Sequence, residues 1–322
     1  MHKFVLAALL LALSFPVHAQ QPTKILRIGY LDNSTASGSV VLVEAFRQEL
    51  SKLGWIEGKN ITIEFRFAEG KNDRLPELGA DLVRLKVDLI VVTSPRPALV
   101  AKSATSTIPI VMVSVGDPVA AGLVANLARP GGNVTGNSSL SVELNTKRLE
   151  ILKDTIPKLA RVGLLRPAGG SDRQLKNLRA AALALKLKLE EIETQPNAKG
   201  LESAFQTAKQ KQVGAIMTTT SVPFFAERKG IVELASKYGL PAIYPENEFV
   251  DEGGLMSYGV DLADLFRRAA VYVDRILKGA KPADLPVQQT TKFEFVINLK
   301  VAKEIGLTIP ARVLERANKV IK

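Results

Sequence analysis

Three carboxylates, Asp32, Asp117 and Glu246, follow apolar segments typical of β-strands, and they are the residues best placed for acid–base chemistry. A glycosidase-like or isomerase mechanism needs two carboxyl groups about 5–10 Å apart, one of them with a pKa raised by burial. Asp117 together with Asp32, or with Glu246, would supply the two carboxyl groups that such a mechanism needs. A carboxylate-dependent enzyme is therefore kept as an alternative to simple binding.

Most other catalytic chemistry is excluded by what the chain lacks. There is no cysteine, and the two histidines, His2 and His18, both lie within the first 20 residues. The chain beyond them has no residue for a Ser-His-Asp triad, a thiol nucleophile, a histidine base or a zinc site of the usual kind. It also has neither a G-x-x-x-x-G-K-[ST] nor a G-x-G-x-x-G motif. We therefore expect no catalytic residue, no metal and no cofactor.

Small and hydrogen-bonding residues follow most of the predicted strands, and these could hold a solute without reacting with it. In open parallel sheets, ligands bind beyond the carboxyl ends of the strands, where helix starts present unpaired N–H groups. We predict ligand-binding roles for Asp32, Asn33, Ser34, Ser94, Pro95, Gly116, Asp117, Ala168, Gly169, Thr219, Thr220, Ser221, Glu246 and Tyr258.

Several of these residues also have a purely structural interpretation. Ser94 and Asp117 each precede a proline, so they are equally well suited to be helix N-caps. The run Thr219 to Ser221 is also explained by β-propensity and capping. Tyr258 precedes Gly259 where the chain is expected to cross between lobes, so it suits a hinge as well as a wall of the site.

The residues are positioned by an alternation of strands and helices. The pattern predicts strands at 25–31, 60–70, 88–94, 108–116, 160–170, 188–193, 213–221, 240–247 and 253–261. It predicts helices at 40–55, 73–87, 97–106, 118–128, 171–185, 201–212, 224–239 and 262–279. An extended, proline-bearing segment with a strand (280–300) and two short helices complete the chain.

The alternation starts again at residue 160 after a Pro- and Gly-rich break at 129–136, which predicts two similar lobes. The expected fold class is α/β, with each lobe a parallel sheet flanked by helices and a hinge of several crossings between them. We assign residues 24–137 plus about 260–283 to the N-terminal lobe. Residues 138–259 plus about 284–322 form the C-terminal lobe.

The N-terminal residues are typical of a secretory signal. Lys3 precedes the apolar run 4–15, and Val17 and Ala19 suit a cleavage site before Gln20. We predict a signal peptide at 1–19 and a soluble protein of the periplasm. The absence of cysteine excludes a lipoprotein.

The chain is basic, with 43 Lys and Arg against 32 Asp and Glu and a formal net charge of +11. The basic residues are interspersed with acidic ones, as in "KRLEILKDTIPK", and no basic run carries aromatic residues. The pattern therefore favours a solvated surface over a nucleic-acid partner.

Long collinear stretches of the chain resemble a known family. They are 45–91, 104–136 ("ATSTIPIVMVSVGDPVAAGLVANLARPGGNVTG"), 148–158 and 240–310. These stretches are similar to the exported substrate-binding components of ABC transporters with the type I periplasmic-binding-protein fold. Within that family, the chain resembles the group described as tryptophan/tyrosine-type or uncharacterised.

The resemblance implies a monomeric clamp that closes on one small-molecule solute and delivers it to an ABC permease in the inner membrane. It also implies that the loop 94–99 cradles a carboxylate at a helix start and that Asp117 pairs with an ammonium group. Arg96, Arg166 and Glu246 depart from the family pattern, which puts an aromatic amino acid as solute in doubt. A ligand-presenting sensor domain is the other alternative, and the sequence does not separate it from import.

Overall fold

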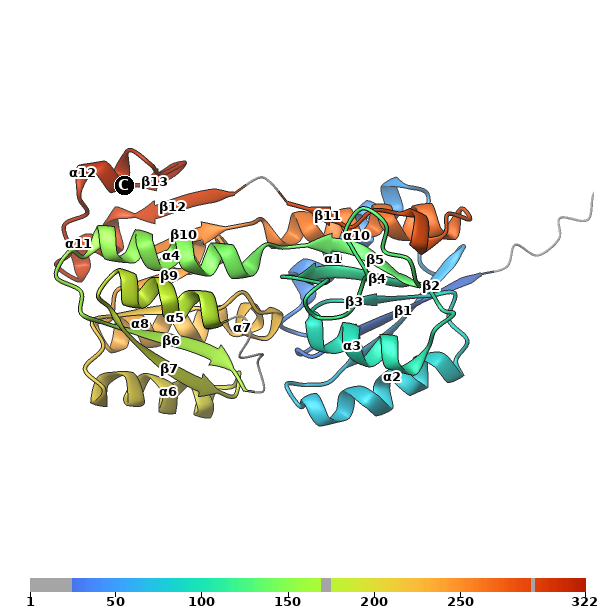
Figure 1. Ribbon diagram of the computed structural model, residues 1–322, viewed down its shortest axis with the longest axis horizontal. Helices are drawn as coiled ribbons and strands as arrows, with labels where there is room; N and C mark the ends of the chain where they lie inside the picture. Colours follow the sequence, from blue (N-terminus) through green and yellow to red (C-terminus); the bar gives the residue numbers. More distant parts are fainter. Residues whose placement is uncertain (1–24, 169–174, 291–292) are drawn as a thin grey trace, which may run out of the picture.

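Two mainly parallel sheets form the frame of the protein, one in each of two lobes that lie side by side (Figure 1). The protein is represented by a computed structural model that describes residues 25–168, 175–290 and 293–322. The predicted signal peptide and Gly169 lie outside these residues. The predicted α/β class with two similar lobes is confirmed.

The first sheet has the strand order β11-β5-β4-β3-β1-β2. Its strands are β1 (Leu26–Asp32), β2 (Ile61–Phe67), β3 (Leu89–Val92), β4 (Ile110–Val115), β5 (Val134–Ser138) and β11 (Gln288–Gln289). Every residue of β3, β4 and β5 is buried, as expected for parallel strands covered on both faces. The flanking helices are α1 (Val40–Lys52), the 3-10 helix η1 (Asn72–Arg74), α2 (Leu75–Arg84), α3 (Pro95–Ala104), α10 (Leu262–Leu277) and the 3-10 helix η3 (Pro282–Asp284).

The second sheet has the order β13-β12-β10-β9-β8-β6-β7, and β10 and β12 are its antiparallel pair. Its strands are β6 (Arg161–Pro167), β7 (Lys188–Thr194), β8 (Ala215–Thr218), β9 (Ala242–Tyr244), β10 (Met256–Gly259), β12 (Glu294–Asn298) and β13 (Lys319–Ile321). Its helices are α4 (Ser141–Thr155), α5 (Leu175–Ala184), α6 (Ala198–Gln210), α7 (Val222–Ala226), α8 (Arg228–Lys237), α9 (Glu248–Asp251), α11 (Leu299–Glu304) and α12 (Ala311–Leu314).

The two sheets share one topology. The order β2-β1-β3-β4-β5 in the first recurs as β7-β6-β8-β9-β10 in the second. In this doubly wound order, connections leave for opposite faces on either side of the first strand, which opens a crevice at its carboxyl end. The crevices between β1 and β3 and between β6 and β8 are therefore the expected binding positions in the two lobes.

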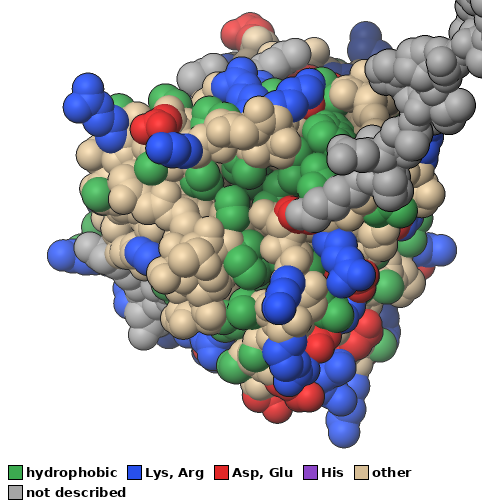
Figure 2. Space-filling model, turned by 90° about the vertical axis from the view of Figure 1, so that its right-hand side faces the viewer, with side chains coloured by type: hydrophobic (Ala, Val, Ile, Leu, Met, Phe, Trp, Pro, Cys, Tyr) green, Lys and Arg blue, Asp and Glu red, His purple; other side chains and the backbone are tan. Residues whose placement is uncertain are grey.

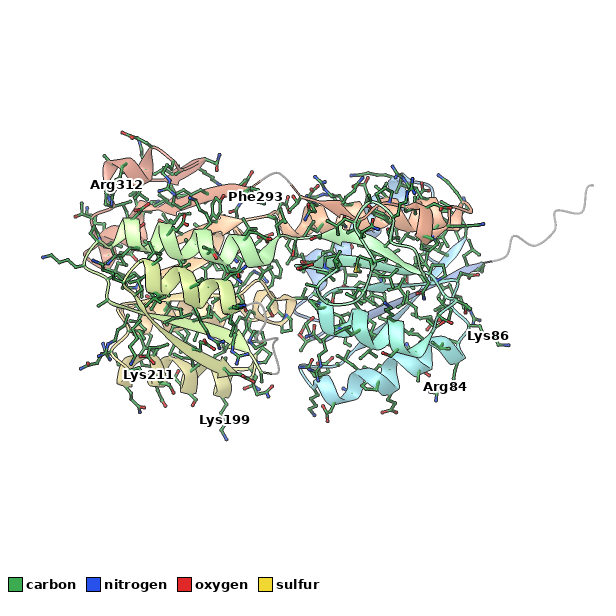
Figure 3. All side chains as sticks on the ribbon, in the orientation of Figure 1. Arg84, Lys86, Lys199, Lys211, Phe293 and Arg312 are labelled. Atoms are coloured by element: carbon green, nitrogen blue, oxygen red, sulfur yellow. The ribbon has the colours of Figure 1, made fainter. Side chains whose placement is uncertain are left out.

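The chain passes between the lobes three times. The first passage joins β5 to α4, the second joins β10 to α10, and the third runs from β11 toward β12. Phe293, in the third passage, lies between the two lobes in Figure 3, and its ring is 6.3 Å from that of Tyr258. Strand β11 pairs with β5, so the chain is still in the first lobe at Gln289 rather than leaving it near residue 284.

Helix α10 brings a late part of the chain back to the first lobe. Its apolar face is buried, and the helix packs against α1 and β4. Trp55, just after α1, donates from Nε1 to Asp274 Oδ1 of α10 at 2.9 Å. This tryptophan therefore has a structural role.

The segment 118–128 is not the helix that the sequence predicted. A single turn begins at Asp117, and Leu123 N–H donates to Pro118 O. Gly122 has φ of 71°, a left-handed conformation that ends the turn. The chain then places Leu123 and Val124 in the first lobe's core. Burying these two side chains outweighs the modest helix propensity of the Ala- and Leu-rich run.

Other elements were also not predicted, among them β5, α4, α9 and β13. Strand β5 has the sequence VTGNS, in which Gly, Asn and Ser are not typical of strands, yet all five residues are buried between β4 and β11. Gly136 fits there because a Cβ would overlap the main chain of Met112, where the register of β4 shifts. The predicted helix at 224–239 is also divided, into α7 and α8.

The Trp55–Asp274 contact should contribute measurably to the free energy of unfolding. Trp55→Phe removes a hydrogen bond to a charged acceptor and should destabilise the protein by about 1–3 kcal/mol. Urea denaturation measures this difference. Lys52→Ala is the control, because the exposed Lys52–Glu49 ion pair of α1 should contribute little. Equal stability of Trp55→Phe and the parent protein would contradict the assignment.

Candidate functional site

A cavity of about 300 Å³ lies between the lobes at the carboxyl ends of the parallel strands. The first lobe contributes Asn33 after β1, Thr93 and Ser94 after β3, and Gly116 after β4. The second lobe contributes Ala168 after β6, together with Thr219, Thr220 and Ser221 after β8. The two crevices thus face each other across one space, so a molecule held there contacts both lobes.

Residues from the helix starts and crossings complete the wall. Apolar side chains come from Leu99 of α3, Leu175 of α5, Val222 and Pro223 of α7, and Leu262 of α10. Arg96 and Arg166 line the same cavity from opposite lobes. Among the residues that the structure describes, no acidic side chain lines it. The cavity therefore combines hydroxyl, amide and apolar groups with two cations.

Eight of the fourteen predicted ligand-binding residues line this cavity: Asn33, Ser94, Pro95, Gly116, Ala168, Thr219, Thr220 and Ser221. Gly169 lies outside the described residues. The other five, Asp32, Ser34, Asp117, Glu246 and Tyr258, are placed elsewhere. The sequence pointed to strand ends that line this cavity but did not show which side chain at each end faces it.

Asp32 and Ser34 lie beneath the cavity wall, inside the first lobe. The Asp32 carboxylate is fully buried and accepts hydrogen bonds from Ser34 N–H at 2.8 Å and from Ser39 Oγ at 3.2 Å. The Ser34 and Ser39 hydroxyls are 2.7 Å apart. Burial raises the pKa of Asp32, and the hydrogen bonds from Ser34, Thr93 and Ser39 act against this shift. The group fixes the β1–α1 turn rather than reaching into the cavity.

Asp117 and Tyr258 are also occupied by structural contacts. Asp117 is exposed, and its Oδ1 accepts from the Ala120 N–H at 2.9 Å, which is the capping role considered above. The Tyr258 ring packs edge-on against Phe295 of β12. Its main-chain oxygen accepts from Arg148 Nη1 at 2.8 Å.

Arg148 of α4 is a polar residue next to the cavity that the sequence did not reveal. Its side chain is fully buried and donates from Nη2 to Asn145 Oδ1 at 2.6 Å and to Thr220 Oγ1 at 3.2 Å. It therefore links a cavity hydroxyl to the second crossing at Tyr258. The sequence pattern did not predict α4, so it gave no indication of this role.

Glu246 is a buried acid whose charge interacts with that of Arg148. Burial lowers the pKa of Arg148 to about 10, and the Glu246 charge acts in the opposite direction. Burial likewise raises the pKa of Glu246 well above its usual range, while Arg148 opposes the rise. Glu246 is thus enclosed in the second lobe and does not line the cavity.

Other cavity residues were missed for local reasons. Asn72 lies in a loop without strand or helix periodicity, and Ser139 follows the unpredicted β5. Thr93 and Ser114 sit at or near the ends of apolar runs where their hydroxyls carry no distinctive spacing. Arg96 and Arg166 were noticed as departures from the family pattern, but their position in the wall comes from the structure.

The lobes touch each other around the cavity. Asn72 Nδ2 approaches the Ala168 oxygen at 3.4 Å. Gly38 lies against Ala226 of α7 so closely that a Cβ on Gly38 would overlap the Ala226 Cβ. Because the lobes touch at these points, they enclose the cavity from both sides.

The fold and this interlobe cavity agree with the comparison to known proteins. The model of the family described as "ABC transporter substrate binding protein" matches residues 37–321. The chain belongs to this family. Members of this substrate-binding family supply solutes to ABC transporters and are not enzymes, so the carboxylate-dependent alternative is wrong.

Two relatives are similar over most of this substrate-binding protein. A tyrosine-binding protein of Clostridioides difficile is 29% identical over 276 residues, covering 82% of this chain and 76% of the relative. The solved structure of an ABC domain from Streptococcus pneumonia in complex with L-Trp is 28% identical, with a TM-score of 0.80 over 92% of this chain and 100% of that one. At 11% to 13% identity, other solute-binding proteins share the type I periplasmic-binding-protein fold.

The lobe arrangement is closer to that of the ligand complex than to an open form. A ligand-free, open substrate-binding protein from Clostridium difficile is 26% identical and also covers 92% of this chain and 100% of that one, but its TM-score is 0.60. The Trp complex scores 0.80 at nearly the same identity and coverage. The present structure therefore superposes more closely on the ligand-bound relative than on the open one.

Closure of the two lobes should depend on the absence of a side chain at Gly38. Gly38→Val places a bulky group against Ala226 and should hold the lobes apart, which lowers solute affinity by about 10- to 100-fold. Isothermal titration calorimetry measures the affinity, and X-ray scattering measures compaction on binding. Gly132→Val is the control, because no atom lies within 4 Å of a Cβ at Gly132. Full closure of Gly38→Val would show that these contacts do not define the closed form.

The buried Asp32 predicts a pH-dependent stability difference. Since its pKa is raised in the folded state, its contribution is fully present below about pH 4 and is lost as pH rises through the folded pKa. Relative to the parent, Asp32→Asn should therefore gain stability between pH 4 and neutrality. Chemical denaturation across this range measures it, with the exposed Glu304→Gln as control. If the difference in unfolding free energy between Asp32→Asn and the parent protein does not change with pH, titration of Asp32 is not its cause.

Proposed function

We propose that this protein is the periplasmic solute receptor of an ABC importer. It captures a small carboxylate-bearing solute with an apolar or aromatic body in the interlobe cavity and releases it unchanged to a permease in the inner membrane. The observation that carries this proposal is a cavity lined from both lobes at their facing strand ends. A solute that contacts both lobes only when they are closed stabilises the closed form.

The solute class is supported by the chemistry of the wall and by the relatives. Hydroxyl groups such as those of Thr219 and Thr220 suit a carboxylate, and Leu99 and Leu175 suit an apolar body. The similar proteins include one described as tyrosine-binding and one solved with L-Trp. An aromatic amino acid or a close analogue is therefore the starting point for the search.

Export by an N-terminal signal peptide over residues 1–19 and action as a monomer belong to the same proposal. Among the described helices, none combines the length and the apolarity needed to span a bilayer. Figure 2 shows Lys and Arg side chains distributed over the end of the first lobe with Asp and Glu between them. This distribution is suited to a solvated surface.

Thermal shift against amino acids, small aromatic acids and nucleosides tests the function. The melting temperature should rise by several degrees for a narrow set of compounds, because binding to the folded state alone stabilises it. Mass spectrometry should then recover the bound compound unchanged after long incubation. If no compound of these classes raises the melting temperature and none is retained on purification, the receptor function is not supported.

A further inference from the structure

The direction of the hydrogen bond between Arg148 and Thr220 follows from the chemistry of the two groups. Arg148 Nη2 lies 3.2 Å from Thr220 Oγ1, and a guanidinium has donors only. The Thr220 hydroxyl must therefore accept this bond. Thr220 is half-buried and lines the cavity, and no atom of the described residues accepts the hydrogen of its hydroxyl. This hydroxyl thus presents a donor to the solute space.

Arg148 is held in position by two other acceptors. Its Nη1 donates to the Tyr258 main-chain oxygen at 2.8 Å, and its Nη2 also donates to Asn145 Oδ1 at 2.6 Å. Arg148 and Asn145 are both buried. The three acceptors belong to α4, to the loop after β8 and to β10. The guanidinium cannot turn away from Thr220 without losing hydrogen bonds in a buried place, so the hydroxyl is oriented before a solute arrives.

The charge of Arg148 makes this donor well suited to an anion. Burial lowers the pKa of Arg148 only to about 10, so the guanidinium is a cation at neutral pH. Its three acceptors are uncharged oxygens, and Glu246, which interacts with it in charge, is not among them. A hydroxyl that accepts from a cation is polarised and becomes a stronger donor. Among solute groups, a carboxylate oxygen gains most from such a donor.

The start of α3, on the opposite wall, offers fewer donors than most helix starts. Ser94 is the N-cap, and Pro95 and Pro97 at the first and third helical positions have no N–H. The Ser94 hydroxyl donates to Asn33 Oδ1 at 3.1 Å. The two walls therefore differ in hydrogen-bond polarity: Ser94 offers a lone pair to the solute, and Thr220 offers a hydrogen.

We propose that Thr220 of the second lobe donates a hydrogen bond to the solute carboxylate, and that Arg148 is the positioning residue that sets the direction of this hydroxyl. The inference rests on the proposed function and deepens it, because it states which wall of the cavity the carboxylate contacts. It places this contact opposite the loop 94–99, where the family resemblance implied it. It also gives Arg148, which does not itself line the cavity, a part in solute selection.

Calorimetry with L-tyrosine tests the donor. Thr220→Val removes the hydroxyl at nearly constant volume and should weaken binding by about 10- to 100-fold, as expected for a hydrogen bond to a charged acceptor. Thr220→Ser keeps the hydroxyl and should restore most of the affinity. Thr207→Val makes the same exchange on α6, where the hydroxyl donates to Ser203 O, and should change nothing. Unchanged affinity in Thr220→Val, or an equal loss in Thr220→Ser or Thr207→Val, overturns the inference.

Tyramine identifies the solute group that meets the hydroxyl. It shares the ring and the amine of L-tyrosine but has no carboxylate. Its binding should be weaker than that of L-tyrosine or absent, and it should be the same in Thr220→Val as in the parent protein. A loss of tyramine affinity in Thr220→Val as large as the loss for L-tyrosine would place another group at the hydroxyl and refute the assignment.

A double-mutant cycle tests whether Arg148 acts through Thr220. Arg148→Met should weaken L-tyrosine binding by about 3- to 10-fold in the parent protein. It should cause little further loss in the Thr220→Val background, because the oriented hydroxyl is already absent. Equal losses in both backgrounds would refute the positioning role. Melting temperatures of the unliganded variants show whether they fold, and Arg148→Lys replaces Arg148→Met in the same cycle if the latter does not.

If L-tyrosine does not bind, the compound retained by the purified protein, or the hit of the wider thermal-shift library, is crystallised with it. A carboxylate oxygen within hydrogen-bonding distance of Thr220 Oγ1 supports the inference. A carboxylate bound elsewhere, or a ligand without one, overturns it and leaves the receptor function intact. The absence of any retained compound and of any thermal shift is instead a failure of the proposed function and removes the basis of the inference.

Discussion

The whole structure depends on the fact that all strands around β1 and β6 run parallel and end at one gap. Parallel strands deliver their carboxyl ends to the same edge of a sheet, and the doubly wound order opens a crevice there. Repeating this order in two lobes, and turning the two edges toward each other, places both crevices in one space. Three crossings of the chain join the lobes, an arrangement that suits a hinge.

Buried polar groups beneath the cavity make its wall rigid. The Asp32, Ser34 and Ser39 cluster fixes the turn after β1, and Arg148 fixes Thr220 relative to the second crossing. Such groups are costly to bury unless their hydrogen bonds are satisfied, so each is held by several partners. These hydrogen bonds hold the main chain and the cavity hydroxyls in fixed positions.

In this family, the core residues determine the fold, and the residues of the cavity wall determine the solute. The lobes superpose on a tryptophan complex although about seven residues in ten differ, because the core needs apolar side chains of suitable size and not particular identities. The cavity wall is less tolerant. Two prolines and an arginine at the start of α3 leave the helix in place but change what it offers to an anion. Similarity therefore supports the mode of binding more strongly than it supports the compound bound.

The sequence by itself determined the α/β class, the two lobes and the strand ends where the solute space lies, because alternating apolar patterns and hydrogen-bonding loops are local properties. It also excluded histidine and cysteine chemistry by composition. It missed β5 and α4 and predicted a helix at 118–128 that does not form, since long-range burial decides these segments. Only the tertiary structure decided that Asp117 faces away, that Glu246 is enclosed with Arg148, and that Thr93 and Arg96 reach the cavity. Side-chain direction at a strand end depends on the packing of the opposite lobe and the crossings, and that packing has no local signature.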